Sequence, residues 1–190
     1  VAQHSIGLTE GEKMARFEIA SLLRQLKLLQ ADLDALTVQL EELAKQMTDY
    51  EYLASVPGIG DATIVELLSE IGPFTQYEHP RQLIKLAGLT LRENSSGQHK
   101  GQKRISKRGR RKLRAVLFRV MMPLIRHNPA FKALHQYYTN RAHNPLRKKQ
   151  SIVVLCGKLL KILHALCHKK IMFNEDAMMK DLYCLQDAVA

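Results

Sequence analysis

Residues 55–74 have the sequence SVPGIGDATIVELLSEIGPF, and this stretch decides the fold. Its first part contains Gly58-Ile59-Gly60, whose glycines allow a tight turn, and apolar residues then recur at helical spacing as far as Gly72. This arrangement predicts a helix–hairpin–helix motif. The amides that open its second helix would point outward and bind a phosphate without reading sequence. Gly58, Ile59 and Gly60 are therefore candidate nucleic-acid contacts, and an ordinary helix–helix corner is the alternative.

Upstream of this motif, the apolar residues alternate steps of three and four, which is the spacing of a coiled-coil seam. The seam residues are Ile19, Leu22, Leu26, Leu29, Leu33, Leu36, Leu40, Leu43, Met47 and Tyr50. No Gly or Pro interrupts the chain between Gly11 and Pro57. We therefore predict a coiled coil over residues 15–53 that joins copies of the chain into a homo-oligomer. An antiparallel helical hairpin, or one long helix packed on its own domain, is the alternative.

Downstream of the motif, further helices are predicted over about residues 79–88, 106–126, 128–138 and 148–169, with residues 89–94 extended. Ser106 is expected to cap the second of these helices. The predicted fold is therefore mainly α: a long coiled-coil helix, then a compact helical domain with the helix–hairpin–helix motif and at most a minor strand element. The expected divisions are an N-terminal tail (1–14), the coiled coil (15–53), the domain (54–174) and a C-terminal tail (175–190).

Positive charge dominates the second part of the chain. The whole sequence has 29 Lys and Arg against 18 Asp and Glu, a net charge of +11. Residues 1–60 hold 5 basic and 9 acidic side chains, whereas residues 61–190 hold 24 basic and 9 acidic ones. No Asp or Glu occurs between Glu93 and Glu175. A polyanionic partner, above all a nucleic acid, is therefore expected downstream.

The densest positive charge lies between residues 100 and 114. We expect the following members to contact DNA or RNA phosphates: Lys100, Lys103, Arg104, Lys107, Arg108, Arg110, Arg111 and Lys112. Charge alone does not separate DNA from RNA, and a localisation tag or a solvated basic face is the alternative. Two-metal phosphoryl transfer requires carboxylates, which this region lacks, so a reaction here needs a side-chain nucleophile or carboxylates from elsewhere.

Other classes of protein fit the sequence poorly. The uncharged apolar stretches are far shorter than the ~18 residues of a membrane span, so no membrane partner is expected. The three cysteines have no paired spacing, which favours a reducing, cytoplasmic compartment. His164, Cys167 and His168 share a helical turn, with Cys156 on nearly the same face, but they form no closed tetrahedral set. No metal site is therefore predicted.

Two serines precede Gly97 on a polar, glycine-flanked segment. Ser95 and Ser96 lie just before the basic stretch, and a serine hydroxyl becomes a nucleophile only with a base or a strongly positive setting. His99 is a candidate base. By itself, a Ser-Ser-Gly sequence more often forms a turn.

Several motifs, taken in order, resemble those of one protein family. They are residues 56–60, residues 67–72, Ala87-Gly88-Leu89, Ser95-Ser96-Gly97, residues 105–109 and Arg126-His127-Asn128-Pro129. Together they resemble the carboxy-terminal domain of the insertion-sequence transposases related to the Piv DNA invertase, the IS-one-ten group. The resemblance covers about residues 54–173, and the order and spacing of the motifs are more specific than any one motif.

The resemblance implies a DNA transposase or site-specific recombinase. In that family a RuvC-like domain with acidic metal ligands is joined by a coiled coil to this domain, and a serine attacks the DNA phosphate under the guidance of a structured RNA. The nucleophile position falls on Ser95, with Ser96 at a neighbouring Ser or Thr position. Mg²⁺ is expected in the RuvC-like domain, and no cofactor is expected in the residues present.

The resemblance also implies that the chain is one part of a larger enzyme. Residues 1–53 have no room for a RuvC-like domain, so we expect the back half of a bacterial, nucleoid-associated transposase that is inactive by itself. Two alternatives stay open. One is a tyrosine-type recombinase with Tyr137 or Tyr138 as nucleophile, and the other is a non-catalytic coiled-coil protein that binds nucleic acid.

Overall fold

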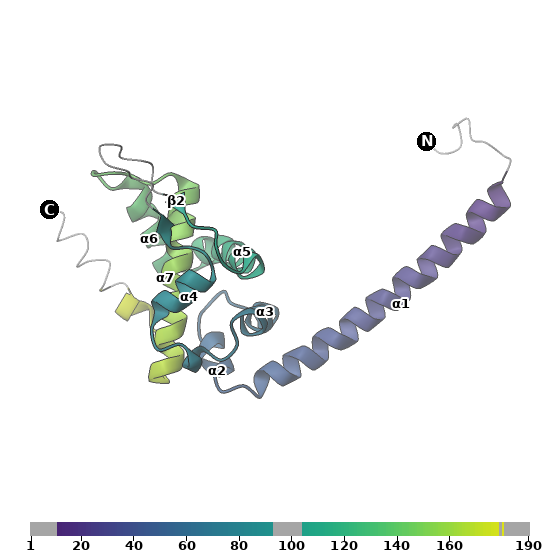
Figure 1. The fold of residues 1–190 in the computed structure, drawn as a ribbon, viewed down its shortest axis with the longest axis horizontal. Coiled ribbons are helices and arrows are strands. Elements are labelled where there is room, and N and C mark those ends of the chain that lie inside the picture. Colours follow the sequence, from purple (N-terminus) through teal and green to yellow (C-terminus); the bar gives the residue numbers. More distant parts are fainter. Residues whose placement is uncertain (1–10, 93–103, 179, 181–190) are drawn as a thin grey trace. The chain divides into compact units, whose positions relative to one another are not determined.

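The computed structural model describes residues 11–92, 104–178 and 180. Over these residues the chain is helical apart from turns and one two-stranded sheet, which confirms the predicted fold class (Figure 1). The chain divides into two units, residues 1–42 and residues 43–190. Each unit is considered by itself.

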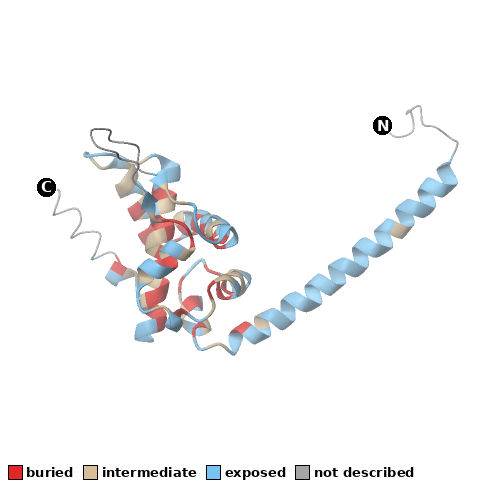
Figure 2. Ribbon diagram, viewed as in Figure 1, coloured by how far each residue is buried: buried red, intermediate tan, exposed pale blue. Residues whose placement is uncertain are grey.

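The first unit consists, in its described part, of most of helix α1 (Glu12–Lys45). The large apolar side chains along this helix are exposed (Figure 2), for example Leu26 at 51% and Leu33 at 63%. The predicted long helix is therefore present, and its apolar seam faces solvent. The coiled-coil partner stays a prediction.

Helix α1 ends earlier than the heptad spacing predicted. A tighter turn closes it, because the Gln46 amide donates to the carbonyl of Leu43 at 3.2 Å and the Met47 amide donates to that of Ala44 at 3.0 Å. Tyr50 then opens a separate helix, α2 (Tyr50–Ala54), and both Met47 and Tyr50 pack against the core of the second unit. The seam spacing thus continued past the true end of the helix.

Residues 50–71 form two helices joined by a turn, as the predicted helix–hairpin–helix motif requires: α2 leads through a turn to α3 (Asp61–Ile71). Gly58 has a φ of +98°, and a Cβ on it would lie 3.0 Å from Cδ2 of Leu124. The carbonyl of Gly60 accepts hydrogen bonds from two amides in the first turn of α3, those of Thr63 at 2.9 Å and Ile64 at 3.1 Å. Glycine at residue 58 therefore satisfies both a backbone conformation and a packing requirement.

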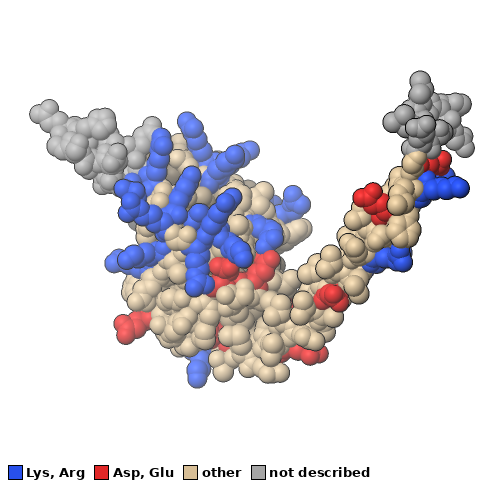
Figure 3. Space-filling view, turned by 45° about the vertical axis from the view of Figure 1, so that its right-hand side comes forward, with Lys and Arg blue, Asp and Glu red and all other residues tan. Residues whose placement is uncertain are grey.

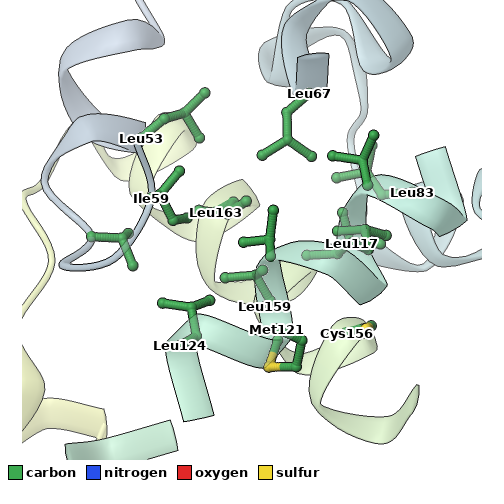
Figure 4. Close-up of a cluster of buried hydrophobic side chains, with 14 of the residues drawn as sticks. Leu53, Ile59, Leu67, Leu83, Leu117, Met121, Leu124, Cys156, Leu159 and Leu163 are labelled. Carbon is green, nitrogen blue, oxygen red and sulfur yellow. The ribbon is translucent and has the colours of Figure 1, made fainter. Parts of the chain in front are cut away.

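Helix α7 (Lys148–Lys169) is the centre of the second unit. It contacts α2, α5 (Arg111–His127), α6 (Pro129–Asn140), α4 (Pro80–Leu86) and the 3₁₀ helix η2 (Phe74–Gln76). Figure 4 shows Leu159 and Leu163 of α7 among Leu117, Met121 and Leu124 of α5. By length and composition α7 resembles a membrane span, but 56% of its most apolar window is buried, as expected for a core helix.

Helices α4, α6 and α7 begin close to the residues that the sequence predicted. The Asn128 side chain accepts from the amides of Ala130 at 3.1 Å and Phe131 at 3.2 Å, which caps α6. The His79 ring accepts from the Arg81 amide at 3.0 Å and caps α4. These caps satisfy amides that lack partners within the helix.

The predicted capping role of Ser106 is wrong. Strands β1 (Leu91–Arg92) and β2 (Arg104–Ile105) pair antiparallel, and the pairing continues past them: the Ser106 amide donates to Thr90 at 2.7 Å and the Arg110 amide to Leu86 at 2.7 Å. This ladder holds residues 106–110 out of a helix, so α5 begins at Arg111 with Arg110 as its N-cap residue.

Candidate nucleic-acid interface

Exposed positive charge gathers around the start of α5. Apart from Arg110, which contacts Glu70, the exposed cations of the predicted basic stretch are Arg104 on β2, Lys107 and Arg108 in the turn, and Arg111 and Lys112 in the first turn of the helix. We call these five residues the α5 basic surface. Figure 3 shows Lys and Arg side chains concentrated on one part of the second unit, with acidic side chains beside them rather than among them.

Two glycines bring the α5 basic surface into position. Gly109 has a φ of +150°, and a Cβ on it would overlap the Leu86 carbonyl oxygen and lie 2.6 Å from the Gly88 amide nitrogen. A Cβ on Gly88 would in turn lie 2.9 Å from the Arg108 carbonyl oxygen. The two segments therefore approach more closely than side chains allow, and this contact carries the basic turn to the start of α5.

The electrostatics of α5 favour a bound anion. Its first turn contains no acidic residue, and the N-cap residue Arg110 makes no side-chain cap. Arg111 and Lys112 thus place positive charge at the positive end of the helix dipole, where acidic groups are normally stabilising. A phosphate at this end would interact favourably with both the side chains and the free amides.

Three arginines near this surface, Arg110 among the predicted residues, also make contacts within the protein. The Arg110 guanidinium donates to the Glu70 carbonyl oxygen and lies 4.0 Å from the Glu70 carboxylate. Arg114 donates to the Ala87 carbonyl at 2.9 Å, and Arg119 forms an ion pair with Glu66. These contacts tie α5 to α3 and α4, so Arg110 uses part of its hydrogen-bonding capacity within the protein.

Four of the predicted site residues, Ser95, Ser96, Lys100 and Lys103, lie outside the described residues. The segment that contains them starts after β1 and ends before β2, and the flanking residues Arg92 and Arg104 are paired across the sheet. The described residues on either side of this segment therefore lie together, and Arg104 belongs to the α5 basic surface.

The hairpin between α2 and α3 is a weaker candidate for phosphate contact. The Ile59 side chain is buried in the core, and Gly58 is packed against Leu124. The first residue of α3 is Asp61, whose carboxylate already compensates the helix dipole. A phosphate contact by the backbone of Gly58, Ile59 and Gly60 stays a prediction.

A second basic cluster was not singled out from the sequence. Arg147, Lys148 and Lys149 are exposed at the start of α7, whose first turn also lacks acidic residues. The signal that could have identified it is the absence of any acid between Glu93 and Glu175. The structure thus contains two helix starts of the same electrostatic type.

The tyrosine alternative gains little support from the geometry. Burial raises the pKa of the Tyr138 phenol, as does the neighbouring Tyr137, while Arg141 acts in the opposite direction. The Arg141 guanidinium lies over the Tyr138 ring at 5.9 Å, and Tyr137 packs edge-on against the same ring at 5.4 Å. These contacts are typical of packing between aromatic and cationic side chains.

The histidines of α7 have structural partners. His164 Nε2 lies 2.7 Å from the Tyr77 carbonyl oxygen, His168 Nε2 lies 3.2 Å from that of Phe74, and the two rings stack at 4.0 Å. Over residues 11–92, 104–178 and 180, no group of three His, Cys, Asp or Glu side chains is placed to hold a metal ion. Mg²⁺ in a RuvC-like domain stays a prediction.

One described Ser–His pair has the contact expected of a nucleophile and its base. His135 Nδ1 lies 2.9 Å from Ser151 Oγ, between α6 and α7. Ser151 is fully buried, so a DNA phosphate does not reach it. The pair joins two helices of the core.

Comparison with known proteins gives a consistent picture. Residues 50–136 match the model of the family described as "Transposase IS116/IS110/IS902 family". The chain is 35% identical over 89 residues to the "Transposase for insertion sequence element IS1111A" of Coxiella burnetii, covering 47% of this chain and 24% of that protein. It is 32% identical over 125 residues to the "Pilin gene-inverting protein" of Moraxella bovis, covering 65% of this chain and 38% of that protein.

A further relative matches along most of the chain. The "Insertion element IS900 uncharacterized 42 kDa protein" of Mycobacterium paratuberculosis is 27% identical over 167 residues, covering 87% of this chain and 40% of that protein. The chain thus spans about a quarter to two fifths of the length of these curated relatives.

Proposed function

Because residues 50–136 match the model of the IS116/IS110/IS902 transposase family, we propose that this chain binds DNA during transposition or site-specific recombination. The observation that carries the proposal is the α5 basic surface. It is exposed, it lies at the positive end of a helix, and it adjoins the sheet from which the segment with Ser95 departs. A DNA backbone is the polyanion that this surface fits best in such a family.

The proposal assigns Ser95 as the nucleophile, with Ser96 as the alternative. Ser95 Oγ would attack a DNA phosphorus, forming a phosphoserine bond while the bond to one deoxyribose oxygen breaks. The serine proton passes to a base, and the departing oxygen takes up a proton. Attack by a second DNA hydroxyl reverses these steps and releases the serine, so that the phosphodiester bond energy is conserved.

The basic residues have a defined part in this reaction. Negative charge grows on the phosphate oxygens as the Oγ–P bond forms, and Arg108, Arg111 and Lys112 would stabilise it. The proposal places Mg²⁺ and its acidic ligands in a RuvC-like domain, and includes a structured guide RNA among the partners. It also includes association of copies through α1.

The first test measures DNA binding by the chain. We expect Arg111→Ala/Lys112→Ala to weaken binding to duplex DNA and to reduce the slope of log K against log salt by about 2, since each phosphate contact contributes ~0.9. The free energy of unfolding should rise slightly, because two charges that oppose the helix dipole are removed. Fluorescence anisotropy over a salt series and urea denaturation measure these effects.

The matched control is Arg126→Ala/Lys132→Ala, which removes two exposed cations outside the α5 basic surface. Its salt slope should stay close to that of the unchanged chain. Equal slopes for the two double variants would show that the α5 basic surface has no special role in DNA binding.

The second test traps the covalent intermediate. The longest reading frame that encodes this chain is incubated with Mg²⁺, guide RNA and nicked DNA, and DNA-linked peptides are identified by mass spectrometry. We expect an adduct on Ser95 that Ser95→Ala abolishes and Ser96→Ala retains. An adduct on Tyr137 or Tyr138 would establish the tyrosine mechanism, and an active protein without any adduct would leave the chain as a non-catalytic binder.

A further inference from the structure

A groove runs along the two-stranded sheet, α5 and α7. It consists of two hollows that share the residues Leu89, Ile105 and Val153. The first hollow is lined in addition by α5 residues that include Arg111 and Phe118, and the second by α7 residues from Val154 to Ala165. We call the two together the α5–α7 groove.

The floor of the α5–α7 groove is apolar and open to solvent. Phe118 is 38% exposed, Val154 is 40% exposed and Leu91 is 69% exposed. Adjacent apolar side chains that face water are typical of surfaces that bind a ligand or a partner. An exposed aromatic ring, in particular, offers a flat face on which a nucleic-acid base can stack.

Basic residues line both hollows of the groove, and no Asp or Glu is among its described lining residues. Lys107 and Arg111 belong to the first hollow and also to the α5 basic surface. Lys158 and Lys161 line the second hollow. An occupant with negative charge along its length and apolar faces between the charges complements this pattern.

Gly157 is a second feature that suits the groove to a ligand. It lies inside α7, where glycine lowers helix stability relative to alanine. A Cβ at this position would have no heavy atom within 4 Å, so packing within the chain does not require glycine. The missing side chain instead keeps the second hollow open and allows a ligand to approach the helix backbone.

We propose that the α5–α7 groove binds a single strand of DNA, with one unpaired base stacked on Phe118 and the next lying over Gly157. The flanking phosphates contact Lys107 and Arg111 at one end and Lys161 at the other. Duplex DNA does not fit the apolar floor, because its bases are stacked on one another and only its backbone faces outward. The proposal rests on the proposed function, since strand exchange generates unpaired DNA that must be held.

The test compares single-stranded and duplex DNA on the same protein. We measure the anisotropy of a fluorescent 12-nucleotide oligo(dT) and of a fluorescent duplex at one salt concentration. Phe118→Ala and Gly157→Leu, which remove the stacking face and fill the second hollow, should each weaken oligo(dT) binding by about tenfold or more. Their duplex affinities should stay within about twofold of the unchanged chain.

Two control variants separate groove contacts from loss of folding. Met122→Ala removes an apolar side chain of the same helix that is 51% exposed and does not line the groove, so it should bind both DNAs normally. Gly157→Ala should unfold at an equal or higher urea concentration than the unchanged chain. If Gly157→Leu does not fold, Phe118→Ala and Lys161→Ala still test the proposal.

The possible outcomes are distinguishable. Unchanged oligo(dT) binding by the folded groove variants would overturn the groove proposal while leaving the DNA-binding function intact. Equal losses for oligo(dT) and duplex would assign the groove to duplex binding instead. The same series is measured with a fluorescent oligo(U) RNA, and a loss confined to that RNA would replace DNA by RNA as the occupant. Failure of the unchanged chain to bind duplex DNA would overturn the proposed function itself.

Discussion

At the scale of single residues, glycines decide where the charged side chains lie. Gly88 and Gly109 allow two backbone segments to touch, and hydrogen bonds from Lys107 to Gly88 and from Arg110 to Leu86 follow from this contact. Lys107 itself has a φ of +54°, which is unusual for a residue with a side chain. The backbone around the α5 basic surface is thus tightly specified.

The substitution Gly109→Ala should strongly destabilise the chain. The new methyl group would overlap the Leu86 carbonyl, and the φ of +150° is unfavourable for alanine, so we expect a loss of about 3 kcal/mol in the free energy of unfolding. The control is Gly60→Ala, where no heavy atom lies within 4 Å of the added Cβ. Urea denaturation measures both, and equal effects would contradict the close approach of the two segments.

The two described cysteines predict how stability changes in alkali. Burial raises the pKa of the Cys156 thiol from 9.0 to about 12. Burial, together with the charge of Asp49 and a hydrogen bond to it, raises the pKa of Cys167 to about 12. The unfolded thiols lose their protons first, so the free energy of unfolding should fall as the pH rises from about 9 to 12.

The variant Cys156→Ala/Cys167→Ala tests this pH dependence. The two proteins need not have the same free energy of unfolding below pH 9, because the comparison concerns only how that free energy changes with pH. We expect a shallower decline between pH 9 and 11 than in the unchanged chain, measured by urea denaturation at several pH values. Parallel declines in the two proteins would show that the thiols titrate alike in the folded and unfolded states.

At the scale of elements, α5 and α7 share the same distribution of charged and apolar residues. Both helices begin with basic residues and without acidic ones, yet both bury an apolar face in the core. Packing therefore holds each helix in place, while its first turn carries charges that isolated helices disfavour. Such an arrangement is suited to a helix whose start binds phosphate.

The seam of α1 makes a prediction about association. Leu29 and Leu36 are 60% and 54% exposed, so a second helix would bury them. Leu29→Glu/Leu36→Glu should convert an oligomer to a monomer in sedimentation velocity. The control Leu28→Glu/Val38→Glu alters residues that are equally exposed but off the seam, and it should leave the oligomer intact. A monomeric unchanged chain would contradict the predicted coiled coil.

At the scale of the whole molecule, charge and apolar surface are divided between the two units. Residues 1–60, which contain α1, are net acidic, whereas residues 61–190 contain 24 of the 29 basic side chains. The exposed leucines of α1 suit contact with protein, and the basic surfaces of the second unit suit contact with nucleic acid. The proposed association and the proposed DNA binding thus belong to separate parts of the chain.

Much of the fold is predictable because helices leave a local pattern. The long helix, the turn at Gly58, the cap at Asn128 and the range of α7 all follow from spacing and capping residues. Two helix boundaries were predicted wrongly, the end of α1 and the start of α5. The apolar spacing of the seam continues past Lys45, where α1 ends. Ser106 is a residue type that often caps helices, but its amide donates to the Thr90 carbonyl.

The sequence by itself determined the helical class, the apolar seam, the family resemblance and the region of positive charge, because these are properties of residues near one another in the chain. Only the tertiary structure decided which cations also pair within the protein. Arg110 and Arg119 contact α3 through Glu70 and Glu66, which lie 40 and 53 residues away in the sequence. The contact of Gly88 with Gly109 and the groove beside Gly157 arise in the same way, since they depend on which distant segments pack together, and no local pattern records that packing.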